Sequence, residues 1–284
     1  MAMALLLAMT GCSSSHRGEE ALPILTVSIE PMRFFAESIA GNLFKVQCMV
    51  PHGSSPETYE PVPRQLMDMA KSDAFLRVGP IGFEQAWIER LSEAAPSMQI
   101  LDMSEGVEFI MEEEEHHVGH SHAGGCEPHI WTSPRNARII ATNIYKALCH
   151  LAPSDSALFR QRWEQLDSMI VCTDDMIRSV LSDGADSTFL IYHPTLSYFA
   201  RDYGLRQLCV EEGGKEPSPA RLRTLVEETR RLGTRVAFIQ REFDMRHAEV
   251  IAQETGCRLV VIDPLSYDWE TGMRKVAQAL SVEL

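Results

Sequence analysis

The architecture of the chain is clearest from residues 153–184, "PSDSALFRQRWEQLDSMIVCTDDMIRSVLSDG". Apolar side chains recur along this stretch roughly at helical spacing, and they are Leu158, Trp163, Leu166, Ile170, Met176, Ile177 and Leu181. Pro153 precedes this pattern and Gly184 follows it, so the spacing predicts one helix of about 28 residues, or about 42 Å. A helix of that length in mid-chain indicates a rigid connection between two lobes. We therefore predict a linking helix over residues 153–183.

Short apolar runs alternate with helical patterns on both sides of this helix. The runs that predict buried strands are 24–29, 44–50, 74–79 and 98–103 before it, and 187–192, 206–211, 235–240 and 258–263 after it. Strands that alternate with helices typically form parallel sheets. We predict an α/β fold with two (β/α) lobes, 22–152 and 184–284, whose sheets are mostly parallel. The cleft between two such lobes is the expected place for a ligand.

The charge of the chain restricts the kind of ligand. Its 284 residues carry a formal net charge of −14, and its pI is about 5.2. Proteins that bind nucleic acids usually present a basic face, so we expect no nucleic-acid partner. Cations are the more natural ligands of so acidic a chain.

The first residues, "MAMALLLAMTGCSSS" (1–15), join a short apolar stretch to small residues and a cysteine. They resemble a bacterial lipoprotein signal, with "AMTGC" as the lipobox and Cys12 as the lipidated residue, although no Lys or Arg precedes the apolar stretch. An ordinary apolar N-terminus is the alternative. We expect residues 1–21 to be signal and linker, and the protein to be exported and membrane-anchored, facing the periplasm or the cell exterior. None of the 7 cysteines has CxxC spacing, so disulfide pairing stays open.

The segment of about 104–128 interrupts the alternation with acidic residues, histidines and glycines. It contains "EEEEHHVGHSH", residues 112–122, with His116, His117, His120 and His122. It has too few large apolar side chains to order itself, so we predict a loop. Ordering each ligand of such a loop costs entropy, and its affinity for a metal should be low. We expect an accessory loop that collects zinc weakly, with a solvated acidic linker as the alternative.

Four potential metal ligands follow strand-like runs. Glu57 follows 44–50, His193 follows 187–192 and Asp263 ends 258–263, while His129 follows the loop that contains 112–122. Ligands of α/β sheets bind at the carboxyl ends of strands, so these side chains could converge. Two imidazoles and two carboxylates, two from each lobe, can complete a four-coordinate shell around a divalent cation.

Several blocks of the chain resemble the cluster A-I solute-binding proteins of ABC transporters, the zinc and manganese group. The blocks are "PETYEP" (56–61), "EPHIWTSPRNA" (127–137), "YHPTLSYFARDYGL" (192–205), "EEGGKEPSPARL" (211–222) and "VVIDPL" (260–265), together with the long central helix. The resemblance implies two lobes on a rigid backbone helix, capture of a metal in the cleft and delivery to a membrane permease. It also implies a protein that is not an enzyme and that we expect to be a monomer.

The resemblance places His129 and His193 on the family's histidine ligands and Asp263 on its C-terminal carboxylate. Glu57 departs from the family, because it occupies a position that is usually histidine. A carboxylate there favours manganese, whereas the histidine-rich loop favours zinc. His52 is a possible substitute donor. We predict Zn²⁺ as the bound ion, with Mn²⁺ as the alternative.

Two other functions use the same residues. A zinc-dependent hydrolase would need an open coordination position and a general base, but the chain contains neither HExxH nor GxSxG. A surface protein that uses the metal only structurally would be unfolded without it, whereas a transport component should fold and only gain stability from the metal.

Overall fold

The N-terminal half contains one parallel sheet of four strands. The structure is a computed structural model that describes residues 21–111, 125–182, 186–211, 217–243 and 245–281. The strands are β1 (Ile24–Val27), β2 (Lys45–Cys48), β3 (Ala74–Arg77) and β4 (Gln99–Asp102), in the order β2-β1-β3-β4. All three pairings are parallel, with Leu25 opposite both Val46 and Ala74. Connecting segments contain α1 (Glu30–Ala40), α2 (Pro63–Met69) and α3 (Gly82–Ala94).

The C-terminal half contains a second sheet with the equivalent order, β6-β5-β7-β8. Its strands are β5 (Thr188–Ile191), β6 (Arg206–Cys209), β7 (Val236–Gln240) and β8 (Arg258–Ile262), again all parallel. The helices of this half are α6 (Ser197–Tyr203), α7 (Pro219–Arg231), α8 (Met245–Thr255) and α9 (Trp269–Leu280). The predicted α/β class and the parallel sheets are confirmed.

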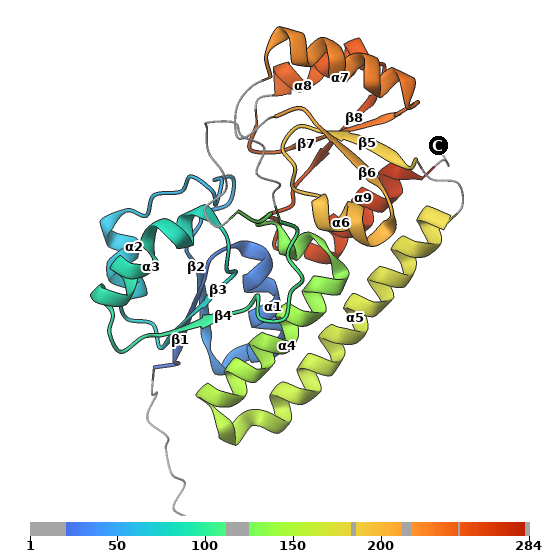
Figure 1. Cartoon of the computed structure of the whole chain (residues 1–284). Helices are drawn as coiled ribbons and strands as arrows, with labels where there is room; N and C mark the ends of the chain where they lie inside the picture. The colour runs from blue at the N-terminus through green and yellow to red at the C-terminus, as the bar shows by residue number, and fades with distance from the viewer. Residues whose placement is uncertain (1–20, 112–124, 183–185, 212–216, 244, 282–284) are drawn as a thin grey trace, which may run out of the picture.

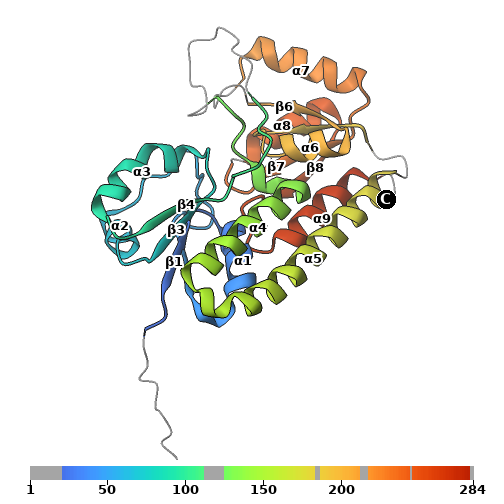
Figure 2. The same ribbon diagram turned by 60° about the horizontal axis from the view of Figure 1, so that its bottom comes forward.

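A single long helix, α5 (Ser156–Ser182, 27 residues), runs along both halves (Figure 1). The segment 153–155, which we assigned to this helix, instead forms a 3₁₀ turn before it, and Asp183 lies outside the described residues. On one side α5 packs against α4 (Pro134–Leu151) and α1, and further along it packs against α9. Figure 2 shows α4, α5 and α9 side by side. The helix therefore supports both sheets.

Helix α4 begins with a side-chain cap. The Ser133 hydroxyl accepts a hydrogen bond from the backbone N–H of Asn136, and Pro134 occupies the first turn. Such a cap satisfies a backbone donor that has no partner within the helix. The cap fixes the direction in which residues 127–133 enter the helix.

The hydrophobic core is continuous between the two halves. Trp131 and Trp269 are buried, and the Trp269 ring packs edge-on against Phe35 of α1 with ring centroids 5.5 Å apart. Trp269 Nε1 donates to the backbone oxygen of Trp131 at 2.7 Å, and Trp131 Nε1 donates to that of Pro264 at 2.8 Å. Helix α9 is thereby joined to α1.

Some of our sequence predictions cannot be compared with this fold. Cys12 and the histidines His116, His117, His120 and His122 lie outside the described residues. Across the part of the chain that is described, no helix is both long and apolar enough to cross a membrane.

Candidate metal centre

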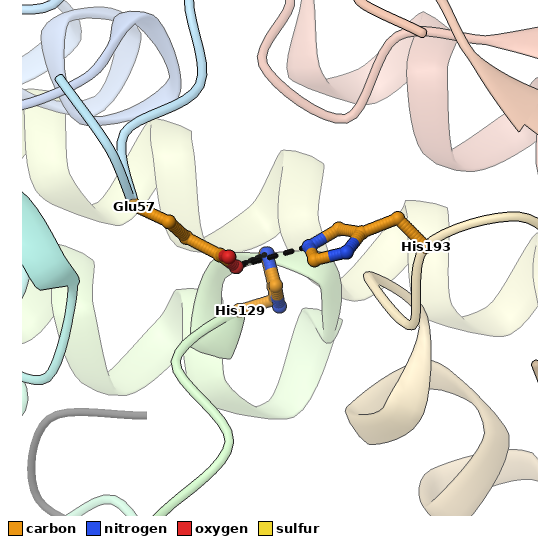
Figure 3. A group of neighbouring side chains, drawn as sticks. All are labelled: Glu57, His129 and His193. Carbon is orange, nitrogen blue, oxygen red and sulfur yellow. Dashed lines mark hydrogen bonds and ion pairs between the residues drawn. The ribbon is translucent and has the colours of Figure 1, made fainter. Parts of the chain in front are cut away.

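Three of the four predicted ligands meet at one point between the sheets (Figure 3). Glu57 lies between β2 and α2, His129 precedes α4, and His193 follows β5. Glu57 Oε1 lies 2.9 Å from Nε2 of His193 and 3.2 Å from Nε2 of His129. One ligand atom from each residue lies within 4.8 Å of the other two, and within the described residues this is the one such group of three. Two nitrogens and one oxygen so arranged can bind a divalent cation.

Helix α3 fixes the loop that carries Glu57. The backbone N–H of Phe83 donates to the Pro56 oxygen at 3.0 Å. Gly82 lies so close that a Cβ atom added there would be 2.3 Å from the backbone oxygen of Glu57. Only glycine permits that approach, so the start of α3 sets the position of Glu57.

Both imidazoles are oriented by a second carboxylate. His129 Nδ1 contacts Glu127 Oε1, and His193 Nδ1 lies 2.5 Å from Glu211 Oε2. With Nδ1 engaged in this way, each ring presents Nε2 to Glu57 and to the space beside it. Carboxylates in this position fix the tautomer and orientation of a metal-binding histidine.

Backbone and side-chain contacts hold this arrangement in place. The Glu127 carboxylate also accepts the backbone N–H of His129 at 3.0 Å, and its backbone oxygen accepts the hydroxyl of Tyr198 at 2.8 Å. Gln240, the last residue of β7, accepts the backbone N–H of His193 at 3.3 Å. The histidines are therefore fixed by the segment before α4, by α6 and by the end of β7.

The electrostatic balance of the site favours a charged carboxylate and charged imidazoles. Burial opposes the charge of Glu57, but hydrogen bonds from His129 and His193 outweigh it and hold the pKa of Glu57 well below its usual range. Burial likewise opposes the charge of His129, yet attraction to Glu127 and hydrogen bonds with Glu127 and Glu57 raise its pKa to about 10. The pKa of His193 is raised against burial by Glu211 and Glu57. A cation that binds here must displace these protons.

The cavity at the site is small, with a volume of about 10 Å³. Its apolar walls include Trp131, Phe243 and Leu265, and the ring of Phe243 lies 5.4 Å from that of His193. A space of this size holds about one water molecule or one ion. The cavity therefore limits how many solvent molecules can join the three side chains around a cation.

The fourth predicted ligand, Asp263, is not part of the group of three. Its Oδ2 atom lies 3.1 Å from His52 Nε2 and 3.7 Å from the Arg241 guanidinium. The next two residues, Pro264 and Leu265, do line the cavity. Asp263 is thus adjacent to the site, with its carboxylate engaged elsewhere.

Sequence reasoning missed Glu127 and Glu211 as partners of the histidines. Glu127 stands two residues before His129. Glu211 follows β6 by two residues, at the same edge of the sheet as His193 after β5. The rule that places ligands at the carboxyl ends of strands could have found Glu211. Only the tight turn before α4 brings Glu127 back onto His129.

Comparison with known proteins gives the family. The model of the zinc-uptake complex component A, periplasmic (ZnuA), matches residues 25–282. The chain belongs to the ZnuA family. A crystal structure of ZnuA superposes with a TM-score of 0.83 at 32% identity, covering 90% of this chain and 97% of that one. A zinc-bound deletion mutant of ZnuA gives a TM-score of 0.84 at 31% identity, over 93% of this chain and 100% of the mutant.

Sequence relatives agree with this ZnuA assignment. A putative metal-binding protein of Chlamydia muridarum is 26% identical over 263 residues, which cover 90% of this chain and 89% of that protein. The zinc-binding lipoprotein AdcA of Streptococcus pneumoniae is 23% identical over 266 residues. That match covers 90% of this chain but 52% of AdcA, so the chain spans about half the length of that relative. The predicted membership of the zinc and manganese solute-binding group is confirmed.

Proposed function

We propose that the protein captures Zn²⁺ outside the cytoplasmic membrane and delivers it to the permease of an ABC importer. The observation that carries this proposal is the convergence of Glu57, His129 and His193 in a small cavity between two parallel sheets. Membership of the ZnuA family supports zinc as the cargo.

The donor set and the cavity favour zinc over manganese. Zn²⁺ is usually four-coordinate and binds imidazole well, whereas Mn²⁺ prefers about six ligands, mostly oxygen. Three side chains and one solvent molecule complete a four-coordinate shell, and a cavity of about 10 Å³ leaves no room for several waters. Glu57 is the one feature that favours manganese, which remains the alternative cargo.

Metal competition tests the choice of cargo. The purified protein, stripped of metal with a chelator, should bind Zn²⁺ more tightly than Mn²⁺ by at least about 100-fold, which corresponds to about 2.7 kcal/mol. Isothermal titration with each ion, and displacement of bound Mn²⁺ by Zn²⁺, would measure this. Equal affinities for the two ions, or tighter binding of Mn²⁺, would contradict the proposal that zinc is the cargo.

The remaining parts of the proposal concern the whole chain. We propose that residues 22–152 and 184–284 form two lobes, joined by residues 153–183. We also propose that the protein is an exported monomer, anchored through lipid on Cys12, and that it is a binding protein rather than an enzyme. AdcA is named a lipoprotein, which supports the anchor. Radiolabelled fatty acid should be incorporated by the full-length chain and not by Cys12→Ala.

The histidine-rich segment is the proposed accessory loop. His116, His117, His120 and His122 would collect zinc weakly beside the cleft. Deleting residues 112–122 should remove weak zinc binding and leave the tight site unchanged in titration. A loss of the tight site after the deletion would place the cargo on the loop itself.

A further inference from the structure

Glu84 is a buried carboxyl group that lies outside the proposed metal site. It belongs to the first turn of α3, its side chain is fully buried, and it is not a member of the group formed by Glu57, His129 and His193. A buried carboxyl group is costly unless hydrogen bonds satisfy both of its oxygens. Its hydrogen-bond donors therefore show which parts of the chain it holds together.

Three donors from the carboxyl ends of two strands satisfy this carboxylate. The backbone N–H groups of Val78 and Gly79, which follow β3, donate to Oε1 and Oε2 at 2.7 Å each, and the hydroxyl of Ser28 after β1 donates to Oε1. Gly79 has a φ of 122°, a conformation that favours glycine, and successive backbone N–H groups of a turn can together bind an anion. Glu84 thereby fastens the start of α3 to the ends of β1 and β3.

The same contacts reach both ends of the loop that carries the proposed carboxylate ligand. At the start of this loop, the backbone N–H of Val50 donates to the backbone oxygen of Ser28 at 3.0 Å. At its end, the backbone N–H of Phe83, the residue before Glu84, donates to the backbone oxygen of Pro56 at 3.0 Å. The hydrogen bond between Ser28 and Glu84 joins these two anchor points, so one buried contact holds both ends of the loop.

We infer that Glu84 is a positioning residue for Glu57, because it holds the start of α3 and the end of β1 together and so fixes the loop that carries Glu57. The inference rests on the proposed metal-binding function. Gly82 transmits the position, since a Cβ atom there would lie 2.3 Å from the backbone oxygen of Glu57. Two segments packed so closely move together. A support that lets a ligand move by about 1 Å loosens a metal site.

The alternative is a residue that only stabilises the N-terminal sheet. Such a residue changes the free energy of unfolding, but the molecules that remain folded bind the cation as before. A positioning residue instead changes the affinity of the folded protein for the cation, and it does so only through the ligand that it positions. Zinc affinity, measured well below the unfolding transition, therefore distinguishes the two roles.

The test is the zinc affinity of full-length variants at about pH 8, measured by titration calorimetry with chelator competition. Burial raises the pKa of Glu84 to about 7, so its carboxyl group is mostly ionised at this pH. Glu84→Gln keeps the size of the side chain but replaces one acceptor oxygen by a donor, which leaves one N–H of the turn after β3 without an acceptor. It should weaken zinc binding about tenfold. In a Glu57→Gln background it should cause less than about twofold further loss.

Ser28→Ala is a smaller change that removes only the hydroxyl donor. It should weaken zinc binding about threefold, and it should add little to Glu84→Gln, because both variants break the same contact.

Two control variants lie in α7. Thr229→Val removes a fully buried hydroxyl and is matched to Ser28→Ala, while Leu225→Ala removes most of a fully buried apolar side chain and controls for general destabilisation. Both should lower the stability and leave the zinc affinity unchanged. In Glu84→Gln, but in neither control, the amides of residues 50–57 should exchange hydrogen faster than in wild type, and an unchanged rate would contradict the inference.

Wild-type affinity in both Glu84→Gln and Ser28→Ala would overturn the inference. A loss that persists in full in the Glu57→Gln background, or that Leu225→Ala reproduces, would also overturn it. If Glu84→Gln does not fold, Ser28→Ala decides by the same criteria. The proposed function fails differently: zinc binding would then be absent, or insensitive to Glu57→Gln and His129→Gln, whatever the effect of Glu84.

Discussion

Glu57 Oε1 lies 2.9 Å from Nε2 of His193, although the two residues are 136 positions apart in the chain. One comes from the loop after β2 of the first sheet and the other from the loop after β5 of the second. His129 completes the group from the segment before α4. Because each part of the chain contributes a donor, no single lobe contains the site.

Replacing Glu57 with Gln should weaken zinc binding by at least about 100-fold. Loss of an outer-sphere partner costs up to about 100-fold in metal affinity, and loss of a ligand should cost no less. An amide is a poorer ligand than a carboxylate and also loses the charge that attracts the cation. Titration calorimetry with chelator competition measures the loss. Glu60→Gln, an exposed residue of the same segment, should bind as wild type. Equal affinities for the two variants would remove Glu57 from the ligand set.

Glu127→Gln and Glu211→Gln should each lower zinc affinity by about 10- to 100-fold. Each carboxylate holds the Nδ1 atom of one histidine and thereby directs Nε2 to the cation. Glu108→Gln, which removes an exposed ion pair with Arg135, is the matched control and should have no effect on affinity. Unchanged affinity in both site variants would show that packing alone orients the rings.

Zinc binding should release the proton of His129 at about pH 8. The pKa of His129 is raised to about 10, so this ring is protonated before the metal arrives, and the pKa of His193 is raised in the same direction. Coordination requires neutral imidazoles. Calorimetry in buffers with different enthalpies of ionisation counts the protons. A binding enthalpy that does not depend on the buffer would argue against histidine ligation.

The stabilisation that zinc confers should increase from about pH 6.5 to about pH 10. The pKa of His129 is higher in the folded protein than in the unfolded chain. Its protonation therefore stabilises the metal-free fold fully below about pH 6.5, and this stabilisation is lost as the pH rises toward 10. As the pH rises over the same range, zinc has fewer protons to displace, so the zinc-loaded protein becomes more stable relative to the metal-free protein. Thermal unfolding of both forms across this range should show a widening difference in Tm, and a constant difference would contradict the assignment.

Gly82→Ala should weaken zinc binding at least about tenfold, because small displacements of a supporting element loosen a site. Its new methyl group would lie 2.3 Å from the backbone oxygen of Glu57 and push that loop away. Gly272→Ala is the control, since its methyl group would lie 3.9 Å from the backbone oxygen of Asp263, which is an ordinary van der Waals contact. Chemical denaturation of both variants would show whether the affinity loss exceeds any general loss of stability.

Much of the fold follows from local patterns that the sequence states directly. The helical period of apolar residues over 156–182 predicts α5, because a helix buried on one side has this period. The short apolar runs predict the eight described strands, because strands of a buried parallel sheet are covered on both faces. The carboxyl-end rule brought Glu57 and His193 to one place. The rule places a residue near an edge, but it does not say which way the side chain turns.

Asp263 illustrates that limit. It satisfies the same rule as His193, yet its carboxylate faces His52 and Arg241, a choice that depends on charges contributed by distant loops. Glu127 is the opposite case, because its contact with the site was not predicted. Nothing in the spacing of "EPH" (127–129) requires the carboxylate of Glu127 to contact the imidazole of His129. Both depend on three-dimensional contacts that no periodicity records.

The two buried tryptophans restrict how the protein can admit its cargo. Trp131 Nε1 donates to Pro264 and Trp269 Nε1 donates to Trp131, so separating the halves would leave two indole donors without partners in an apolar interior. A wide swing of one half against the other is therefore costly. The ion therefore enters and leaves through local movement of the loops at the carboxyl ends of the strands, while the two halves stay in contact. A permease that receives the ion would meet nearly the same molecule before and after delivery, and would distinguish the two states by those few loops.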